Sequence, residues 1–203
     1  MDKLSLIAQK YDTDKGLQHH GYTPIYDKYF SQFVGKGITF LEIGIGGYEY
    51  NDRGGGSLNM WAEYFQNAKV IGVDLYDKSQ IKKDKRVEVH KFSQIDGMAF
   101  YNLFQHGVPD IVIDDASHIN DLTIQTFKIV FPYLKEGAIY VIEDTHTSYW
   151  QENFRGTTDL NSKDTAIGYM TSLVHQLHIE SREQNYFGIK SIHFYKQQIF
   201  IFK

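Results

Sequence analysis

Short apolar segments alternate with amphipathic segments along this chain, and that alternation restricts the possible folds more than any other feature. The apolar segments cover residues 38–44, 69–75, 86–92, 110–115 and 138–144. Runs such as ITFLEIG and DIVIDD are too short for helices, and they are apolar on both faces, as strands inside a parallel sheet are. We therefore predict a strand at each of these five places.

Helical periodicity fills the intervals between the predicted strands. Residues 57–65 place Leu58, Trp61 and Phe65 on one side, and Ser57 is the expected N-cap. Further helices are predicted over residues 98–104, 121–134 and 167–179. Strand–helix alternation of this kind predicts an α/β fold, a doubly wound and mostly parallel sheet with helices on both faces.

The C-terminal segment has a different pattern from the rest of the chain. Residues 186–203 contain two β-rich stretches around residues 196–198, which predicts a closing antiparallel hairpin. A hairpin added to a doubly wound sheet is typical of the class I methyltransferase (Rossmann-like) variant of the fold. We expect one domain over residues 1–203, with a helical preamble or lid over residues 1–36 and a mobile loop at residues 151–163.

Composition excludes several classes of protein. The net charge of −4 and the scattered Lys and Arg residues provide no basic surface for nucleic acid. The absence of Cys excludes disulfides, thiolate catalysis and cysteine-ligated metals. The apolar runs are far shorter than the roughly 18 residues that cross a bilayer. The first residues lack the pattern of a secretory signal, so we expect a cytoplasmic protein with no membrane span.

Glu42 and a glycine-rich turn at Gly44 follow the first predicted strand, and Asp74 ends the second. A carboxylate at that second strand end is placed to accept hydrogen bonds from a ribose diol. It lies further from the glycines than the roughly 20 residues of the dinucleotide fingerprint, because residues 48–56 are inserted. The insert ends in three glycines before Ser57, whose N–H groups could face a carboxylate or phosphate. This pattern suits a nucleoside with an amino-acid tail, although glycine turns also follow buried strands for packing reasons alone.

Acidic residues gather at the next two predicted strand ends. Asp114, Asp115 and His118 follow the fourth strand, and Glu143 and Asp144 follow the fifth. Carboxylates converging on one rim repel each other unless a cation neutralises them, and hard oxygen donors suit Mg²⁺, Mn²⁺ or Ca²⁺. A histidine beside such a site is suited to accept a proton near neutral pH. The alternative is that some of these acids cap helices or pair with Lys and Arg.

These motifs resemble those of a known family. They are YDTDK, YTPIY, LEIGIGGYEYNDRGGGSLNMW, VIGVDLYDKS, IVIDDASH and YVIEDTHTSYW, all within residues 11–150, and the tail from Ser162 onward follows more loosely. Over this range the chain resembles the metal-dependent sugar O-methyltransferases of the macrocin and mycinamicin group. Two positions depart from the family pattern, because Ala116 stands in place of a glycine and Phe92-Ser93 in place of Gly-Asp.

The resemblance implies a methyltransferase domain that uses S-adenosylmethionine and Mg²⁺, or Mn²⁺, to methylate a sugar hydroxyl in polysaccharide or antibiotic biosynthesis. It implies Asp115, Glu143 and Asp144 as metal ligands and His118 as the general base. It also implies that Glu42, Gly44 and Ser57 hold the methionine part of the cofactor and that Asp74 holds the ribose. Ser93 and Gln94 would contact the adenine side, and Thr13 and Tyr22 would help to close the site.

Other functions stay open at this point. The acceptor would carry vicinal hydroxyls, and a catechol-type aromatic diol chelates Mg²⁺ as a sugar diol does. A non-catalytic nucleotide- or sugar-binding module is disfavoured by the acidic residues with His118, and a nicotinamide oxidoreductase by the long insert. Iron oxygenases use two His and one carboxylate, a pattern that is not visible here. The sequence leaves open whether the chain forms a homo-oligomer.

Overall fold

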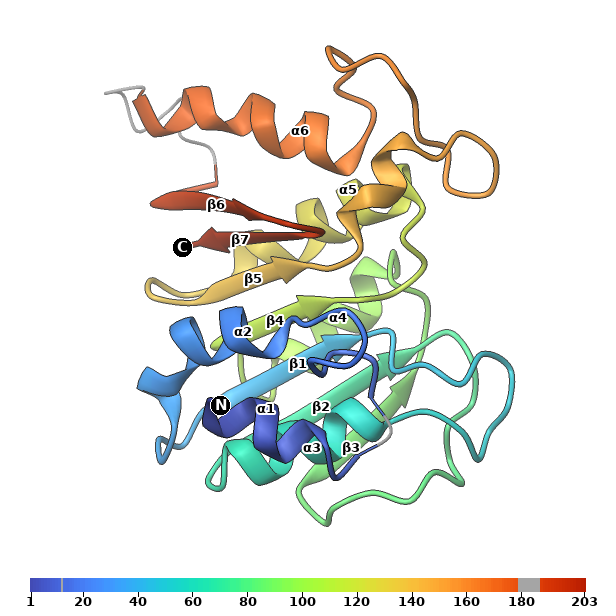
Figure 1. The fold of residues 1–203 in the computed structure, drawn as a ribbon, viewed down its shortest axis with the longest axis vertical. Helices are drawn as coiled ribbons and strands as arrows, with labels where there is room; N and C mark the ends of the chain where they lie inside the picture. The colour runs from blue at the N-terminus through green and yellow to red at the C-terminus, as the bar shows by residue number, and fades with distance from the viewer. Residues whose placement is uncertain (12, 179–186) are drawn as a thin grey trace. The chain divides into compact units, whose positions relative to one another are not determined.

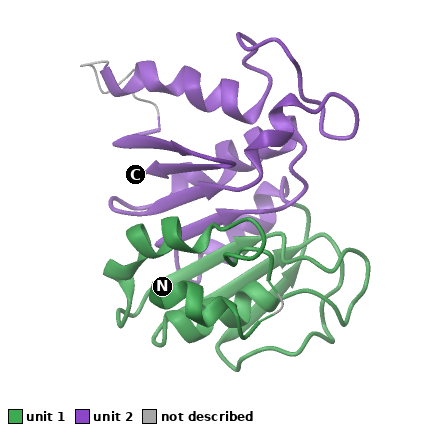
Figure 2. Cartoon of the chain, in the orientation of Figure 1, with its two compact units in different colours: residues 1–93 green, residues 94–203 purple. Residues whose placement is uncertain are grey.

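The computed structural model describes residues 1–11, 13–178 and 187–203, and the chain divides into two compact units (Figure 2). Unit 1 comprises residues 1–93, and unit 2 comprises residues 94–203. The single domain that the sequence suggests stays a prediction. Among the described residues, there is no helix with the length and apolar character that a membrane crossing needs.

Unit 1 is built on three parallel strands, β1 (Thr39–Ile43), β2 (Lys69–Asp74) and β3 (Val87–Lys91), with β2 in the middle (Figure 1). Leu41 pairs with Ile71, and Ile71 pairs with Glu88. Nearly every residue of β1 and β2 is buried, as expected of strands covered on both faces. All three predicted strands of this unit are confirmed.

Helices account for much of the start of unit 1. The helices are α1 (Lys3–Ala8), α2 (Thr23–Phe30), the 3₁₀ turn η1 (Ser31–Phe33) and α3 (Gly56–Tyr64). Helix α1 packs against α2 and α3, and α3 packs against β2. The rings of Tyr26 and Phe40 lie 5.3 and 4.8 Å from that of Trp61, so the aromatic residues fill a core rather than line a surface. The lid role of the preamble stays a prediction.

Helix α3 corrects one detail of the sequence interpretation. Gly55, in the left-handed region at φ 73°, is the N-cap, and the helix begins at Gly56. The Ser57 hydroxyl lies inside the first turn and donates to Glu42 instead. The prediction of Ser57 as N-cap is therefore wrong, because a buried carboxylate takes the hydroxyl that a cap would use.

Unit 2 contains β4 (Ile111–Asp114), β5 (Ile139–Ile142), β6 (Ser191–Tyr195) and β7 (Gln198–Phe202). Strands β4 and β5 are parallel, whereas β7 pairs antiparallel with both β5 and β6 (Figure 1). The hairpin turns at Gln197, whose φ is 64°. The predicted α/β fold with mostly parallel strands and a C-terminal antiparallel hairpin is thus confirmed.

The helix predicted over residues 98–104 is confirmed, whereas the α-helices predicted over residues 121–134 and 167–179 end earlier than predicted. The helices of unit 2 are α4 (Gly97–Phe104), α5 (Asn120–Val130), η2 (Phe131–Tyr133), η3 (Thr145–Tyr149), α6 (Ala166–Leu173) and η4 (Val174–His178). The helix predicted over residues 121–134 tightens to 3₁₀ at Pro132, because proline cannot donate a helical hydrogen bond. The last residue of the helix predicted over residues 167–179, Ile179, lies outside the described residues.

Candidate functional site

The turn after β1 is a glycine-lined loop that folds back on itself. Gly44, Gly46 and Gly47 all have φ between 72 and 85°, and the Gly44 N–H donates to the Val73 carbonyl at 2.8 Å. A Cβ on Gly54 would lie 2.3 Å from the Gly46 carbonyl oxygen, so only glycine fits where the two arms of the loop touch. The Gly55 N–H donates to the Ile45 carbonyl and is not free for a ligand, in contrast to the sequence expectation.

A buried lysine holds this loop from inside. Lys78 is 1% exposed, and its ammonium donates to the carbonyl oxygens of Tyr48, of Tyr50 at 3.0 Å and of Arg53 at 3.3 Å. A lysine is almost never buried without partners. These three hydrogen bonds satisfy the buried ammonium and hold the inserted segment in place. The sequence analysis did not single out Lys78, although this residue lies in the VIGVDLYDKS motif, because a lysine after a strand is usually at the surface.

A second buried lysine, Lys15, pairs with the acid that precedes the glycine turn. The Lys15 ammonium is 3.3 Å from Oε1 of Glu42, and the Ser57 hydroxyl donates to Oε2 at 2.8 Å. The side chains of Lys15 and Glu42 are 1% and 0% exposed. Glu42 and Ser57, which the resemblance assigns to the methionine part, are thus joined to each other and to Lys15, a partner that sequence reasoning did not single out.

Asp74 ends β2 and is partly exposed. Its Oδ2 accepts from the Ile45 N–H at 3.1 Å and its Oδ1 from the Tyr76 N–H at 2.9 Å. These bonds orient the carboxylate toward the turn after β1, and each oxygen keeps a lone pair for a further donor such as a ribose hydroxyl. The ribose-binding role of Asp74 stays a prediction.

Thr13 and Tyr22 both lie next to Lys15. The Thr13 hydroxyl accepts from the Lys15 N–H at 3.4 Å, and the Tyr22 N–H donates to the Lys15 carbonyl at 3.0 Å. Tyr22 is only 2% exposed, and its ring stacks on His20 with a centroid distance of 5.0 Å. Thr13 and Tyr22 therefore contact the main chain of the lysine that pairs with Glu42.

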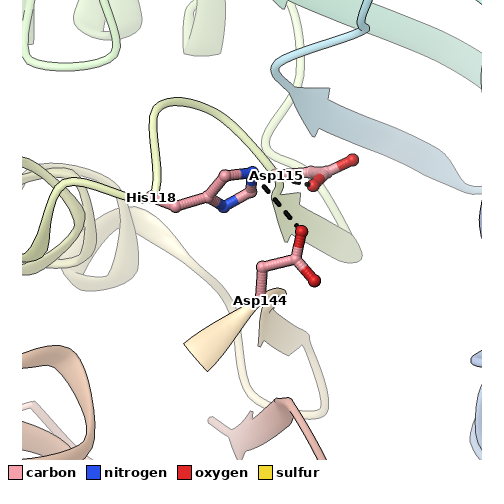
Figure 3. Close-up of side chains that lie close together, drawn as sticks. All are labelled: Asp115, His118 and Asp144. Carbon is pink, nitrogen blue, oxygen red and sulfur yellow. Dashed lines mark ion pairs between the residues drawn. The ribbon is translucent and has the colours of Figure 1, made fainter. Parts of the chain in front are cut away.

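Unit 2 brings two carboxylates and an imidazole together where β4 and β5 end (Figure 3). Nε2 of His118 lies 3.7 Å from Oδ1 of Asp115 and 3.6 Å from Oδ2 of Asp144. The ligand atoms of these residues all lie within 4.8 Å of one another. Their side chains are 17 to 22% exposed, so water and a small ligand can reach them. We call Asp115, His118 and Asp144 the cluster.

The other two acids of these strand ends lie elsewhere. Asp114 is buried and accepts from the Tyr140 hydroxyl at 3.1 Å, and burial raises the pKa of its carboxyl to about 7. Asp114 is the last residue of β4, whereas Asp115 follows the strand and belongs to the cluster. Glu143 is 3% exposed, and within the described residues it does not join the cluster. The four carboxylates therefore do not all converge on one rim.

Two cluster residues have strained backbone. His118 has φ 55° and Asp144 has φ 51°, in the left-handed region that residues with a side chain seldom adopt. Such residues gather at functional sites and persist only where the surroundings hold them. Contacts with surrounding residues are therefore needed to keep the backbone of His118 and Asp144 in this conformation.

Ser93 and Gln94 lie on either side of the division between the two units. Gln94 is 8% exposed, and its amide donates to the Thr126 hydroxyl at 3.0 Å and accepts from the Ser117 N–H at 3.2 Å. Its side chain thus supports the loop that carries His118. Its assignment to the adenine side stays a prediction, as does that of Ser93.

The donor atoms of the cluster fit a divalent metal. Carboxylate oxygens are the preferred ligands of Mg²⁺ and Mn²⁺, and an imidazole nitrogen is also accepted by Mn²⁺. In unit 1, the carboxylate of Asp74 and the glycine turn fit the ribose and tail of a nucleoside. The residues present are therefore compatible with both groups that the resemblance implies.

Comparison with known proteins shows which proteins the chain is similar to. No family model matches it. It is 38% identical over 175 residues to demethylmacrocin O-methyltransferase of Streptomyces fradiae, a match that covers 86% of this chain and 44% of that protein. It is 40% identical over 177 residues to 8-demethyl-8-alpha-L-rhamnosyl tetracenomycin-C 2'-O-methyltransferase of Streptomyces olivaceus, covering 86% and 46%.

A solved structure agrees with these relatives. The MycE methyltransferase of the mycinamycin biosynthetic pathway, in complex with Mg, SAH and mycinamycin VI, superimposes with a TM-score of 0.90 at 34% identity. The match covers 100% of this chain and 54% of that one. The chain belongs to the macrocin and mycinamicin O-methyltransferase family. It spans about half the length of these family members.

Proposed function

We propose that the chain forms the catalytic part of an O-methyltransferase that uses S-adenosylmethionine and Mg²⁺ to methylate a sugar hydroxyl of a saccharide or glycosylated natural product. The observation that carries this proposal is the cluster at the ends of β4 and β5, in a chain similar to sugar O-methyltransferases throughout its length. The cytoplasmic location suggested by the sequence stays a prediction.

Most of the residues proposed to bind the donor belong to unit 1, and Gln94 belongs to unit 2. Asp74 would accept from the ribose hydroxyls. Gly44, together with Glu42 and Ser57, which are hydrogen-bonded to each other, would hold the methionine tail. Thr13 and Tyr22 would close this side, and Ser93 and Gln94 would contact the adenine. S-adenosylmethionine supplies an electrophilic methyl group, so the protein has to supply position and a proton acceptor.

The acceptor would bind to residues of unit 2. Asp115 and Asp144 would hold Mg²⁺, and their partial exposure would leave room for ligands from the acceptor. Glu143, which is buried outside the cluster, is proposed as a third ligand on the resemblance alone. A bound Mg²⁺ fixes two vicinal hydroxyls and makes the attacking one more acidic. His118, whose Nε2 faces both aspartates, would accept the proton as the new C–O bond forms.

A catechol-type diol is the alternative acceptor, because its two oxygens chelate a metal in the same way. The relatives favour the sugar, since their names give demethylmacrocin and a rhamnosyl tetracenomycin as the compounds methylated. MycE was crystallised with mycinamycin VI, so a glycosylated macrolide belongs among the first acceptors to try.

The decisive experiment is a methyl-transfer assay with a panel of acceptors. The protein is incubated with S-adenosylmethionine, Mg²⁺ and, separately, glycosylated macrolides, rhamnosylated polyketides, nucleotide sugars and catechol, and products are identified by mass. We expect a methylated sugar, loss of turnover in EDTA, and recovery with Mg²⁺ or Mn²⁺. Full activity in excess chelator would exclude the metal from the reaction. Methylation of catechol alone would favour the alternative acceptor.

A further inference from the structure

A single hydroxyl joins the two strained residues of the cluster. Oγ1 of Thr147 lies 3.1 Å from the carbonyl oxygen of His118 and 3.0 Å from that of Asp144. A threonine hydroxyl carries one proton, so the two carbonyls share it in a three-centre hydrogen bond. Residues that come from different segments of unit 2 are thereby linked through their main chains.

The Thr147 hydroxyl bonds the main chain at two residues with left-handed backbone, His118 and Asp144. A left-handed conformation costs a residue with a side chain on the order of 1–3 kcal/mol, and both His118 and Asp144 adopt it. The orientation of each side chain depends on that conformation, because φ sets the direction of the Cα–Cβ bond. A contact with both carbonyls therefore helps to keep the His118 imidazole and the Asp144 carboxylate facing each other (Figure 3).

Thr147 is itself firmly held. It is 4% exposed, and its N–H donates to the Asp144 carbonyl at 3.1 Å. Its own carbonyl accepts from the side-chain amide of Asn120 at 3.2 Å. Asn120, which is 1% exposed, also donates to the Phe154 carbonyl at 2.9 Å and accepts from the Ala166 N–H at 2.7 Å. The hydroxyl is thus fixed by the first turns of α5 and α6.

We propose that Thr147 is the positioning residue of the cluster: its hydroxyl, by bridging the carbonyls of His118 and Asp144, sets the distance and direction between the proton acceptor and a metal ligand. It touches neither metal nor acceptor and acts through the two residues that it bridges. The part of this inference that concerns metal affinity rests on the proposed function, whereas the part that concerns backbone conformation does not.

Three variants test the role of the hydroxyl. Thr147→Val keeps the shape of the side chain and removes the hydroxyl, and Thr147→Ser restores a hydroxyl at the same position. Thr123→Val is the matched control, because Thr123 is equally buried at 4% and lies within α5 of the same unit. Mn²⁺ is titrated into each protein and followed by electron paramagnetic resonance, with SAH affinity and the unfolding temperature measured alongside.

We expect Thr147→Val to weaken Mn²⁺ binding about 10- to 100-fold, the usual effect of removing a residue that orients metal ligands. Thr147→Ser should recover most of the affinity, and Thr123→Val should bind Mn²⁺ as the wild type does. SAH affinity should stay unchanged in all three. Equal Mn²⁺ affinity in wild type and Thr147→Val would overturn the proposal, and so would an equal loss in Thr123→Val.

Crystal structures of the wild type and Thr147→Val separate this inference from the proposed function. We expect φ of His118 or Asp144 to leave the left-handed region in the variant, whether or not the wild type binds Mn²⁺. If the wild type binds no Mn²⁺ but the backbone shifts, the metal-dependent function fails while the positioning role holds. If both φ values are unchanged in the variant, the positioning role is wrong.

Discussion

The two candidate sites are held together by different kinds of side chain. In unit 1, the glycine loop depends on charged groups, because Lys78 binds three carbonyls and Lys15 pairs with Glu42. In unit 2, the cluster depends on neutral groups, through the hydroxyl of Thr147 and the amides of Asn120 and Gln94. Both sets are buried, so the difference lies in charge and not in exposure.

This difference is consistent with the ligand that we propose for each site. A buried ammonium makes strong, charge-assisted bonds and can fix a long insert around one point. Near Asp115 and Asp144 an ammonium would compete with a metal for the carboxylates, whereas a hydroxyl or an amide holds the backbone and leaves the negative charge available. Charged side chains are therefore suited to holding the glycine loop of unit 1, and neutral side chains are suited to holding a cation site.

The largest effect should come from the cluster. If His118 accepts the hydroxyl proton, His118→Ala should lower the catalytic rate by roughly 10²- to 10⁴-fold, the usual contribution of a positioned base. SAH affinity should not change, because His118 is not among the residues proposed to bind the donor. Single-turnover rates and calorimetric titration of SAH measure the two quantities. A variant that keeps most of its rate would show that the proton leaves by another route.

The positions of several acids at the strand ends could be predicted from the sequence. Asp74, Asp115 and Asp144 each follow a short apolar run, and the carboxyl ends of parallel strands are where such folds bind ligands. Strand positions were predictable for the same reason, since burial on both faces leaves a run of apolar residues. The tail hairpin was visible from its β-rich stretches, which β6 and β7 confirm.

The supporting residues could not be predicted in the same way. Lys15, Lys78 and Thr147 act by contacts with residues distant in sequence, and no local pattern distinguishes a buried lysine from a solvated one. The direction of Asp114 was also missed, because which of two consecutive acids faces the core depends on the strand register. Tertiary contacts decide these roles, so they emerge only once the chain is folded.

The next largest effect should come from the charged support of unit 1. Lys15→Met leaves the Glu42 carboxylate buried without its cation, which typically costs about 3–5 kcal/mol of folding free energy. Lys10→Met is the matched control, because Lys10 pairs with Glu63 at the surface, where its side chain is 59% exposed. Such exposed pairs contribute about 0–1 kcal/mol. Urea unfolding compares them, and an equal loss in the two variants would contradict the importance of the buried pair.

A smaller effect is expected when a ligand contact is removed without disturbing the support. Asp74→Ala should weaken SAH binding by roughly 1–3 kcal/mol, the cost of leaving ribose hydroxyls without acceptors. Mn²⁺ affinity should stay the same, since the cluster lies in unit 2. Calorimetry with SAH, with NAD as the control ligand, measures the loss. Tighter binding of NAD than of SAH by the wild type would contradict the assignment of this site to the methyl donor.

The smallest effect concerns the pH dependence of stability, which should differ between a charged contact and a neutral one. The Arg86 guanidinium bonds Asp84 and the Gln66 carbonyl, so it joins the start of β3 to the end of α3. The hydrogen bond from Arg86 to the carboxylate lowers the pKa of Asp84. Because the folded pKa is below the unfolded one, this stabilisation is present above the ordinary Asp value of about 4 and is lost as the pH falls through the folded pKa.

Asp84→Asn should therefore lower the unfolding free energy by less than about 1 kcal/mol at pH 7, because the pair is about one-third exposed. The difference from wild type should shrink as the pH approaches 3. Thr126→Val supplies the neutral comparison, since the Thr126 hydroxyl accepts from Gln94 and donates to the Leu122 carbonyl without titrating. Its loss should stay constant over the same pH range. If both variants show the same dependence on pH in urea unfolding, charged and neutral support do not differ in the way that the contacts indicate.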